Sequence, residues 1–300
     1  MASWQAHFFS FLLRHTFKRQ LAASAGSIEG IRKVMNGGMF RTPADVRIRE
    51  ERVGQTNGEW VTPAGSGNPD VLLLYLHGGG YIACSPKTHR PYTTFFAKNG
   101  FLVYAPDYRL APEHRFPAGL DDAVAAYKAL QRLHPGMTIV IAGDSAGGGL
   151  ALATMLQLRD ESGVSLPAAA VLFSPLTDLT GSGASRSRND KRCAMFHGEG
   201  LKLVNNYYLR DGEDPANPLV SPLYADLRGL PPMLIHVGAD ETLLDDSTAL
   251  AERAKQAGVQ VQINVWPAVP HVWQMFVQMM PEARASLRAA ASFLQNPAAG

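Results

Sequence analysis

The sequence predicts an α/β fold, in which helices flank a mostly parallel central sheet and a helical cap covers part of it. Strand-like and helix-like segments alternate along most of the chain, and repeated strand–helix units are the usual connection in parallel sheets. Several strand segments are continuous apolar runs, such as residues 71–76, as expected for strands covered on both faces. Residues 138–158 predict a short strand, a glycine-rich turn and an apolar helix.

The predicted elements begin with two strands and then alternate. Strands are expected at 45–53, 59–62, 71–76, 101–105, 138–142, 168–173, 233–237 and 259–265, and helices at 118–133, 149–158, 247–257 and 281–296. In the last strand, valine and isoleucine alternate with glutamine and asparagine, which leaves one polar face. We therefore expect the strand at 259–265 at an edge of the sheet.

Composition excludes several functional classes. The chain has 300 residues, of which 46% are apolar and 18% charged, so it can bury a large core. A net charge of +2 gives no electrostatic case for nucleic acid. The two cysteines, Cys84 and Cys193, cannot form a disulfide framework and fit a reducing compartment. No run of 18 apolar residues predicts a membrane span.

Two regions do not follow the strand–helix alternation. Residues 181–191 are small and polar, and a helix is expected at 201–209, although one crossover helix would suffice there. The N-terminal residues are predicted as helices and loops. We expect a cap over the carboxyl edge of the sheet, with residues 1–44 as its N-terminal part and 181–215 as its insertion, on a main domain formed by 45–180 and 216–300.

The N-terminal segment contains a short apolar run at residues 8–13, followed by Arg14, Lys18 and Arg19. Basic residues precede the apolar run in a signal peptide, and this run is too short for one. We expect a cytoplasmic protein whose first helix is amphipathic and packs on the body or contacts substrate. Binding to a membrane surface remains an alternative for this helix.

The turn at Gly143-Asp-Ser-Ala-Gly147 carries the first candidate for chemistry. Glycines on both sides of Ser145 allow the sharp strand-to-helix turn, known as a nucleophile elbow, that exposes a serine hydroxyl above a sheet. The alternative is a glycine-rich turn with an ordinary surface serine. The strand before the turn and the helix after it favour the elbow.

A serine hydroxyl needs a base, and in elbow proteins the acid and the histidine follow the serine along the chain. Three histidines follow Ser145. His197 falls in the predicted cap, and His236 lies inside an apolar strand, where it is better explained as a core residue. His271 lies in a loop directly after a strand, which makes it the candidate base.

The base needs a carboxylate that holds its tautomer. Asp240 follows the strand at 233–237 and is the first candidate, with the neighbouring Glu241 as its main rival. Asp245 and Asp246 are better explained as caps of the next helix.

Three glycines at 78–80 follow a sheet strand and leave backbone N–H groups uncovered. Together with the N–H of Ala146 at the start of a helix, they can stabilise the oxyanion of a tetrahedral intermediate.

A different arrangement also deserves weight. His77, Asp107 and Ser145 occur in the chain order of trypsin-like proteases, and Gly143–Gly148 is similar to the serine motif of that family. Those proteases are all-β and rich in disulfides, whereas this chain alternates strands and helices and has two cysteines. The α/β interpretation is therefore favoured.

Taken together, five features resemble the hormone-sensitive-lipase-like family of α/β-hydrolase carboxylesterases, the bacterial family IV esterases: His77-Gly-Gly-Gly80, Asp107-Tyr-Arg-Leu-Ala-Pro-Glu-His114, Gly143-Asp-Ser-Ala-Gly-Gly148, Asp240 and His271. The resemblance implies an α/β-hydrolase fold from about residue 70 onward, with a helical cap. It implies Ser145 as nucleophile, His271 as base and Asp240 as acid. It further implies an oxyanion hole formed by Gly78, Gly79 and Ala146.

The chain departs from the family pattern at two places. Gly149 replaces a common asparagine, and Asp240-Glu-Thr-Leu replaces the usual Asp-Pro-Leu, which weakens the choice of Asp240 over Glu241. Family members often pair edge strands as dimers, and residues 259–265 are a candidate for such pairing.

We therefore predict a serine carboxylesterase that hydrolyses short- to medium-chain carboxylic esters through an acyl-enzyme, without metal or cofactor. Tyr81 and Trp273 adjoin the loops of the site and are predicted to line the substrate pocket. The alternative is a non-catalytic small-molecule receptor on the same fold.

Overall fold

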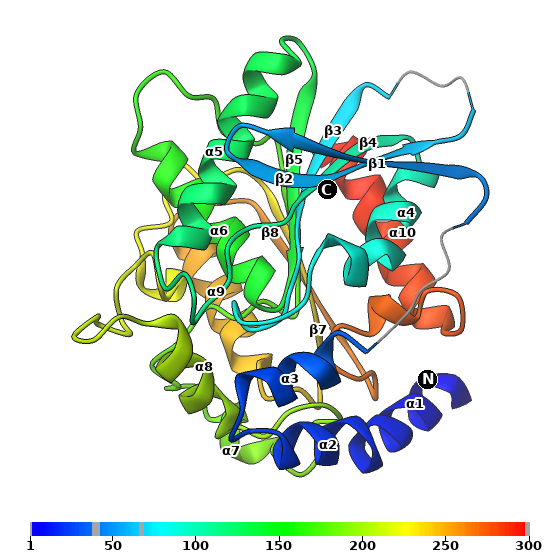
Figure 1. The fold of residues 1–300 in the computed structure, drawn as a ribbon, viewed down its shortest axis with the longest axis vertical. Coiled ribbons are helices and arrows are strands. Elements are labelled where there is room, and N and C mark those ends of the chain that lie inside the picture. The colour runs from blue at the N-terminus through cyan, green and yellow to red at the C-terminus, as the bar shows by residue number, and fades with distance from the viewer. Residues whose placement is uncertain (1, 38–42, 66–68, 298–300) are drawn as a thin grey trace.

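The computed structural model describes residues 2–37, 43–65 and 69–297, and its centre is one eight-stranded sheet (Figure 1). The strand order is β1-β2-β4-β3-β5-β6-β7-β8. The strands are β1 (Val46–Val53), β2 (Thr56–Pro63), β3 (Val71–Leu76), β4 (Phe101–Pro106), β5 (Thr138–Asp144), β6 (Ala170–Phe173), β7 (Met233–Gly238) and β8 (Val261–Trp266). All eight predicted strands are present, with shifts of a few residues at their ends.

Strands β3 to β8 run parallel to one another, whereas β1 and β2 are antiparallel to their neighbours. The carboxyl ends of β3, β5, β6, β7 and β8 therefore meet at one edge, where ligands of open α/β sheets bind. β8 is the last strand, which confirms the predicted edge position, and its Val265 is 47% exposed.

Helices cover both faces of the sheet, which gives three layers (Figure 1). One face carries α5 (Ala118–Leu133), α6 (Ala146–Arg159) and α9 (Leu244–Gln256), and the other carries α4 (Arg90–Lys98) and α10 (Pro281–Gln295). The side chains of β3 alternate between the two cores: Leu72, Leu74 and Leu76 pack on the α5–α6 side, and Leu73 and Tyr75 on the α4–α10 side. This is the double burial that its continuous apolar run predicted.

The sequence analysis placed no helix at α4. Its threonines and phenylalanines are residues that favour strands. Six of its nine residues are buried, so its sequence lacks the polar face by which an amphipathic helix is predicted. A short 3₁₀ helix, η1 (Pro86–His89), leads into it.

The remaining helices lie together beyond the carboxyl edge of the sheet, at the bottom of Figure 1. They are α1 (Trp4–His15), α2 (Phe17–Ala23), α3 (Ile28–Met35), α7 (Ser185–Arg188) and α8 (Gly200–Tyr208). The N-terminal helices contact the segment between α7 and α8. Lys18 Nζ of α2 donates to Cys193 O at 3.1 Å, and the Phe17 ring packs edge-on against Phe196. The predicted bounds of the cap, residues 1–44 and 181–215, stay a prediction. Residues 38–42 of its N-terminal part lie outside the described residues.

The structure explains why Gly149 replaces asparagine in α6. A Cβ atom at this position would lie 2.1 Å from Leu176 O and 2.7 Å from the Tyr81 hydroxyl. Both distances are shorter than van der Waals contact, so the Tyr81 side chain and Leu176 backbone occupy the space of any larger residue.

Candidate active site

Ser145 lies at the apex of a sharp turn between β5 and α6. Its backbone angles are φ 52° and ψ −123°, which a non-glycine residue adopts only under strain. A Cβ at Gly143 would lie 2.3 Å from Gly147 O, and one at Gly147 would lie 2.1 Å from Leu76 O. The flanking glycines are thus required by close backbone approach, and the predicted elbow is confirmed as a backbone geometry.

His271 lies in the loop after β8, immediately before the 3₁₀ helix η3 (Trp273–Phe276). Its ring is 2% exposed, and its Nδ1 hydrogen-bonds Glu241 Oε2. Its Nε2 is buried and has no partner among the described residues. His271 and Ser145 line the same cavity, so the unpartnered nitrogen belongs to the site that contains the serine.

The carboxylate at the histidine is Glu241 and not Asp240, so the predicted acid is corrected. Glu241 is 1% exposed, whereas Asp240 Oδ1 accepts a hydrogen bond from Arg192 Nε at 2.8 Å. The reason is the turn after β7: Gly238 N donates to Glu241 Oε1 at 2.5 Å, which folds the Glu241 side chain back under the strand end. The same turn directs Asp240 toward Arg192 on the cap side.

Two residues that the sequence analysis missed hold Glu241 in place. Ser174, one residue beyond β6, donates from Oγ to Glu241 Oε1 at 2.7 Å. Asn189 Nδ2, from the inserted segment, donates to Ala239 O at 3.1 Å and to Glu241 O at 2.9 Å. Ser174 directly follows a predicted strand, which was the available signal. Asn189 lies in a polar segment and gave none.

Asp245 and Asp246 do not cap α9, contrary to expectation, because they lie inside its first turn and reach outward. Asp245 Oδ2 accepts from Ser185 N at 2.8 Å, and Asp246 Oδ2 accepts from Thr177 N at 3.0 Å. Burial raises the pKa of Asp246 to about 6, although the charge of Arg186 opposes the rise.

The predicted oxyanion donors also need one correction. Gly78 N already donates to Asp144 Oδ1 at 3.1 Å and lies 3.3 Å from His89 Nε2, so it is not open to a ligand. Within the described part of the chain, the N–H groups of Gly79, Gly80 and Ala146 have no protein acceptor. Gly79 and Gly80 line the cavity, and Gly78 does not.

A buried network fixes the glycine loop to the elbow. Asp144 is 1% exposed and accepts hydrogen bonds from Tyr75 Oη at 2.8 Å and from Gly78 N, and its Oδ2 lies 3.2 Å from His89 Nε2. Burial opposes ionisation of Asp144, but the charge and hydrogen bond of His89 and the Tyr75 hydroxyl outweigh it and hold the pKa of this carboxyl below its usual value. His89 was missed, because the helix that it precedes was missed.

The protease-like arrangement is excluded. His77 is fully buried, its ring stacks on Tyr108 at 4.2 Å, and its Nδ1 lies 2.7 Å from Gly78 O. Burial lowers the pKa of His77 to about 3, so it is neutral. Asp107 lies on the exposed surface and takes no part in this arrangement.

The cavity over Ser145 has a volume of about 1310 Å³ and mostly apolar walls. Residues from α2, α3 and α8, with Phe196 and Met275, enclose it. Tyr81 and Trp273 do not line it, which corrects the two predicted lining residues. Tyr81 stacks on Tyr208 at 4.0 Å, and Trp273 is fully buried against Trp266. Both residues adjoin the site in sequence, but their rings point into the packed interior.

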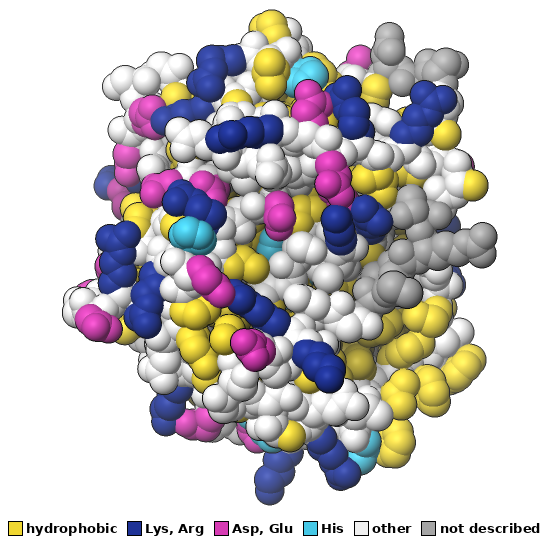
Figure 2. All heavy atoms as spheres, viewed as in Figure 1, with side chains coloured by type: hydrophobic (Ala, Val, Ile, Leu, Met, Phe, Trp, Pro, Cys, Tyr) yellow, Lys and Arg dark blue, Asp and Glu magenta, His cyan; other side chains and the backbone are white. Residues whose placement is uncertain are grey.

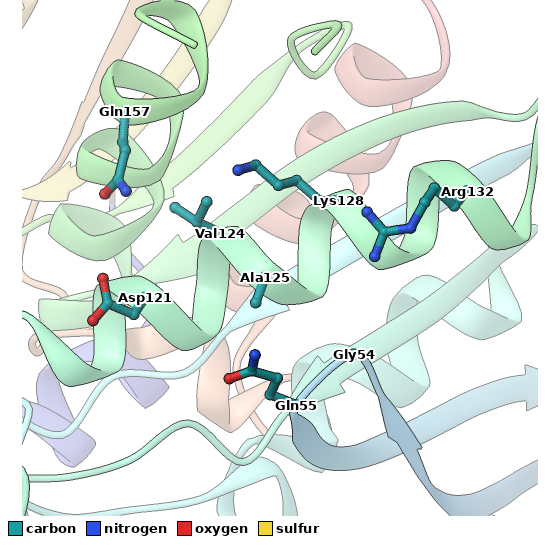
Figure 3. A pocket seen from close by; sticks show the side chains of 8 residues that line it. All are labelled: Gly54, Gln55, Asp121, Val124, Ala125, Lys128, Arg132 and Gln157. Carbon is teal, nitrogen blue, oxygen red and sulfur yellow. The ribbon is translucent and has the colours of Figure 1, made fainter. Parts of the chain in front are cut away.

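A second hollow, of about 260 Å³, lies between the β1–β2 turn and α5 (Figure 3). Asp121, Lys128 and Arg132 of α5 line it together with Gln55 of the β1–β2 turn and Gln157 of α6. Its lining includes no serine, cysteine or histidine, and the Lys128 ammonium is paired with Glu161. The chemistry of this chain is therefore concentrated in the larger cavity.

His236 is a core residue, as predicted. Its Nδ1 lies 2.6 Å from Ser286 Oγ and its Nε2 lies 3.1 Å from Asn264 Nδ2. Burial lowers the pKa of His236 to about 4 from its ordinary 6.5.

This burial predicts acid sensitivity of the fold. Between pH 6.5 and 4 the unfolded chain binds a proton at His236 that the folded chain does not, so the free energy of unfolding falls as pH falls through that range. The full difference corresponds to about 3 kcal/mol. We expect His236→Gln to flatten the pH dependence of urea unfolding in this window. An unchanged slope in that variant would contradict the assignment.

Comparison with known proteins agrees with this geometry. Residues 73–275 match a family that is described by its alpha/beta hydrolase fold. An acetyl-hydrolase of Streptomyces hygroscopicus is 44% identical over 81% of each chain, and an esterase of Acinetobacter venetianus is 35% identical over 97% of this chain and 96% of that one. A crystal structure of an esterase from the bacterial hormone-sensitive lipase family superposes with a TM-score of 0.91, at 38% identity and 99% coverage of each chain.

The chain belongs to this α/β-hydrolase family, in which its relatives are carboxylic ester hydrolases, and it is an ester-hydrolysing enzyme. The resemblance to hormone-sensitive-lipase-like esterases is confirmed. Among the described residues, no helix combines the length and apolar character needed to cross a bilayer. Nor do the described His, Cys, Asp and Glu side chains gather in threes as metal ligands do.

Proposed function

We propose that this enzyme hydrolyses carboxylic esters with Ser145 as nucleophile, His271 as general base and Glu241 as the acid that orients the base. The observation that carries the assignment is the state of His271. Its Nδ1 is held by a buried carboxylate, its Nε2 has no partner among the described residues, and His271 lines the same cavity as Ser145. A histidine oriented in this way accepts a proton at Nε2 only.

In the proposed reaction, the Ser145 proton passes to His271 Nε2 while Oγ attacks the ester carbonyl carbon. The resulting oxyanion accepts hydrogen bonds from the N–H groups of Gly79, Gly80 and Ala146. His271 returns the proton to the leaving alkoxide, and the acyl group remains on Oγ. A water molecule then gives a proton to Nε2 and attacks the acyl carbon, which releases the carboxylic acid and restores the serine hydroxyl.

We further propose short- to medium-chain acyl groups as substrates. The apolar cavity is much larger than an acetyl group requires, and the cap helices close it on the side opposite the sheet. Val204 of α8 reaches toward the glycine loop, since a Cβ at Gly80 would lie 3.3 Å from Val204 Cγ2. This side chain is therefore placed to limit the space beside the reacting carbonyl.

Enlarging Val204 tests the substrate proposal. We expect Val204→Phe to lower kcat/KM for p-nitrophenyl decanoate at least tenfold and for p-nitrophenyl acetate less than threefold, because the added ring fills acyl space. Val204→Ala is the matched control and leaves activity on long esters intact. Equal losses at both chain lengths would contradict an acyl wall at α8.

Two further parts of the proposal concern the whole molecule. The exposed edge of β8 supports a homodimer through residues 259–265, and light scattering of Val265→Lys tests it by a shift to monomer. The two cysteines are free and buried, which supports a reducing, cytoplasmic compartment. Cell fractionation tests that placement.

A further inference from the structure

The first helix carries an apolar ridge that no other described element covers. Trp4, Phe8, Phe11 and Leu12, which we call the apolar ridge, are 72%, 50%, 59% and 38% exposed. Their spacing of three and four residues places them along one side of α1. Half of the eight large hydrophobic side chains that stand exposed in the described structure belong to this one helix.

The ridge is held rigidly and faces outward. On the other side of α1, the Phe9 ring stacks on Phe276 at 4.9 Å, and Ser10 Oγ donates to Ala268 O at 2.8 Å. Ser3 caps the helix and also donates to Glu282. Figure 2 shows hydrophobic side chains gathered at the lower right corner, where Figure 1 places α1. The inner side of α1 is already packed on the body, so the exposure of the apolar ridge is a property of the folded state.

The charged side chains of α1 and α2 themselves are all basic. The first acidic residue of the chain is Glu29, and before it stand Arg14, Lys18 and Arg19. Arg14 is half-buried and donates to the backbone carbonyl of Arg192, and Arg19 is exposed. Lys18 is 5% exposed and donates to the carbonyl oxygens of Asp190 and Cys193, so it is turned into the protein. An aromatic ridge beside cations, with no nearby acid on its own segment, complements an apolar layer under an anionic surface.

The ridge is continuous along the chain with residues that line the substrate cavity. Leu13 and Thr16, directly after the ridge, line that cavity, and so do Phe17 and Leu21 of α2. An ester that partitions into a lipid layer under the ridge would therefore be close to the helices that enclose Ser145.

From these observations we propose that the apolar ridge docks the enzyme on an anionic phospholipid surface. The aromatic rings enter the interface between headgroups and acyl chains, and Arg19 and the half-buried Arg14 contact the headgroups. The docking depends on α1 and not on the catalytic residues, so vesicle binding tests it independently of the proposed triad. Self-association of two ridges is the competing outcome.

Trp4 provides a direct readout, because it is 72% exposed, whereas Trp60 and Trp273 are buried and Trp266 is half-buried in the packed cluster behind α1. We expect vesicles of phosphatidylcholine with about a third phosphatidylglycerol to shift the tryptophan emission to the blue and to sediment the full chain. Trp4→Phe should remove the shift and keep the sedimentation. Failure of the unaltered enzyme to bind these vesicles at low salt would overturn the proposal.

Matched variants distinguish binding through the apolar ridge from nonspecific hydrophobic adsorption. The variant Phe8→Ser/Phe11→Ser should bind vesicles at least tenfold more weakly, whereas Leu133→Ser, which removes a 60% exposed leucine of α5, should bind normally. Arg19→Glu should weaken binding several-fold, with Arg52→Glu on β1 as the exposed control. Normal hydrolysis of soluble p-nitrophenyl acetate and a normal circular dichroism spectrum show that each variant is folded.

Three results would count against docking on lipid. Normal vesicle binding by Phe8→Ser/Phe11→Ser excludes the ridge as the contact. Equal binding to pure phosphatidylcholine excludes the electrostatic part. Sedimentation equilibrium that shows a dimer lost in Phe8→Ser/Phe11→Ser, without vesicle binding by the unaltered chain, assigns the ridge to self-association.

Discussion

Ser145→Ala is expected to lower kcat for p-nitrophenyl butyrate hydrolysis by about four powers of ten or more, because no covalent acyl-enzyme can form without Oγ. KM and the urea midpoint should stay close to those of the unaltered enzyme, since alanine also fits the elbow. The residual rate reflects the oxyanion donors and substrate binding alone. Steady-state kinetics with active-site titration measures the effect.

A fluorophosphonate probe supplies the control for this experiment. It should label the unaltered enzyme at Ser145 and leave Ser145→Ala unlabelled. Near-normal turnover by the alanine variant would refute the serine mechanism. An unaltered protein that neither turns over esters nor takes the probe would instead favour the receptor alternative on the same fold.

Glu241→Gln is expected to lower kcat about 10⁴-fold, whereas Asp240→Asn should change it less than threefold. Glutamine can keep the hydrogen bond from Gly238 N at its carbonyl oxygen, but its amide then donates to His271 Nδ1. That contact places the ring proton on Nε2, which can no longer accept the serine proton. The comparison is sharp because the two carboxylates are adjacent in sequence and differ by one methylene.

The pH profile of kcat/KM separates a catalytic effect from a folding effect. Glu241→Gln should remain folded with a lower rate, and Asp240→Asn should reproduce the unaltered profile. A large loss of kcat in Asp240→Asn with little loss in Glu241→Gln would identify Asp240 as the acid. That result would contradict the contacts of His271. Loss of the Arg192 ion pair alone predicts only a small change, because that pair is partly exposed.

Periodicity and apolar runs predicted the sheet well, because these patterns follow directly from which faces are buried. The continuous run at Val71–Leu76 gave both ends of β3 correctly, and alternation in the segment before Trp266 placed β8 at the edge. Helix α4 was missed for the same physical reason. It is buried over most of its surface, so its sequence lacks the polar stripe by which amphipathic helices are found.

In the site, the sequence predicted correctly those residues whose position is set by the local chain. It failed for residues whose role is set by contacts with distant parts of the chain. The elbow around Ser145 follows from its glycines, and His271 followed from the order of elements. The choice between Asp240 and Glu241 depends on a turn held by Gly238 N and Ser174, which no local pattern encodes. Gly78 looks like its neighbouring glycines, and only its hydrogen bond to Asp144 shows that its N–H is occupied.

The amide of Asn189 has a consequence for protein engineering. Asn189 belongs to the predicted insertion, is 1% exposed and holds the turn that presents Glu241. Ser185 Oγ, from the same insertion, donates to Thr242 O at 2.8 Å. Exchanging this segment for that of another esterase in order to alter selectivity would therefore also loosen the carboxylate of the proposed triad, unless the graft retains both side chains.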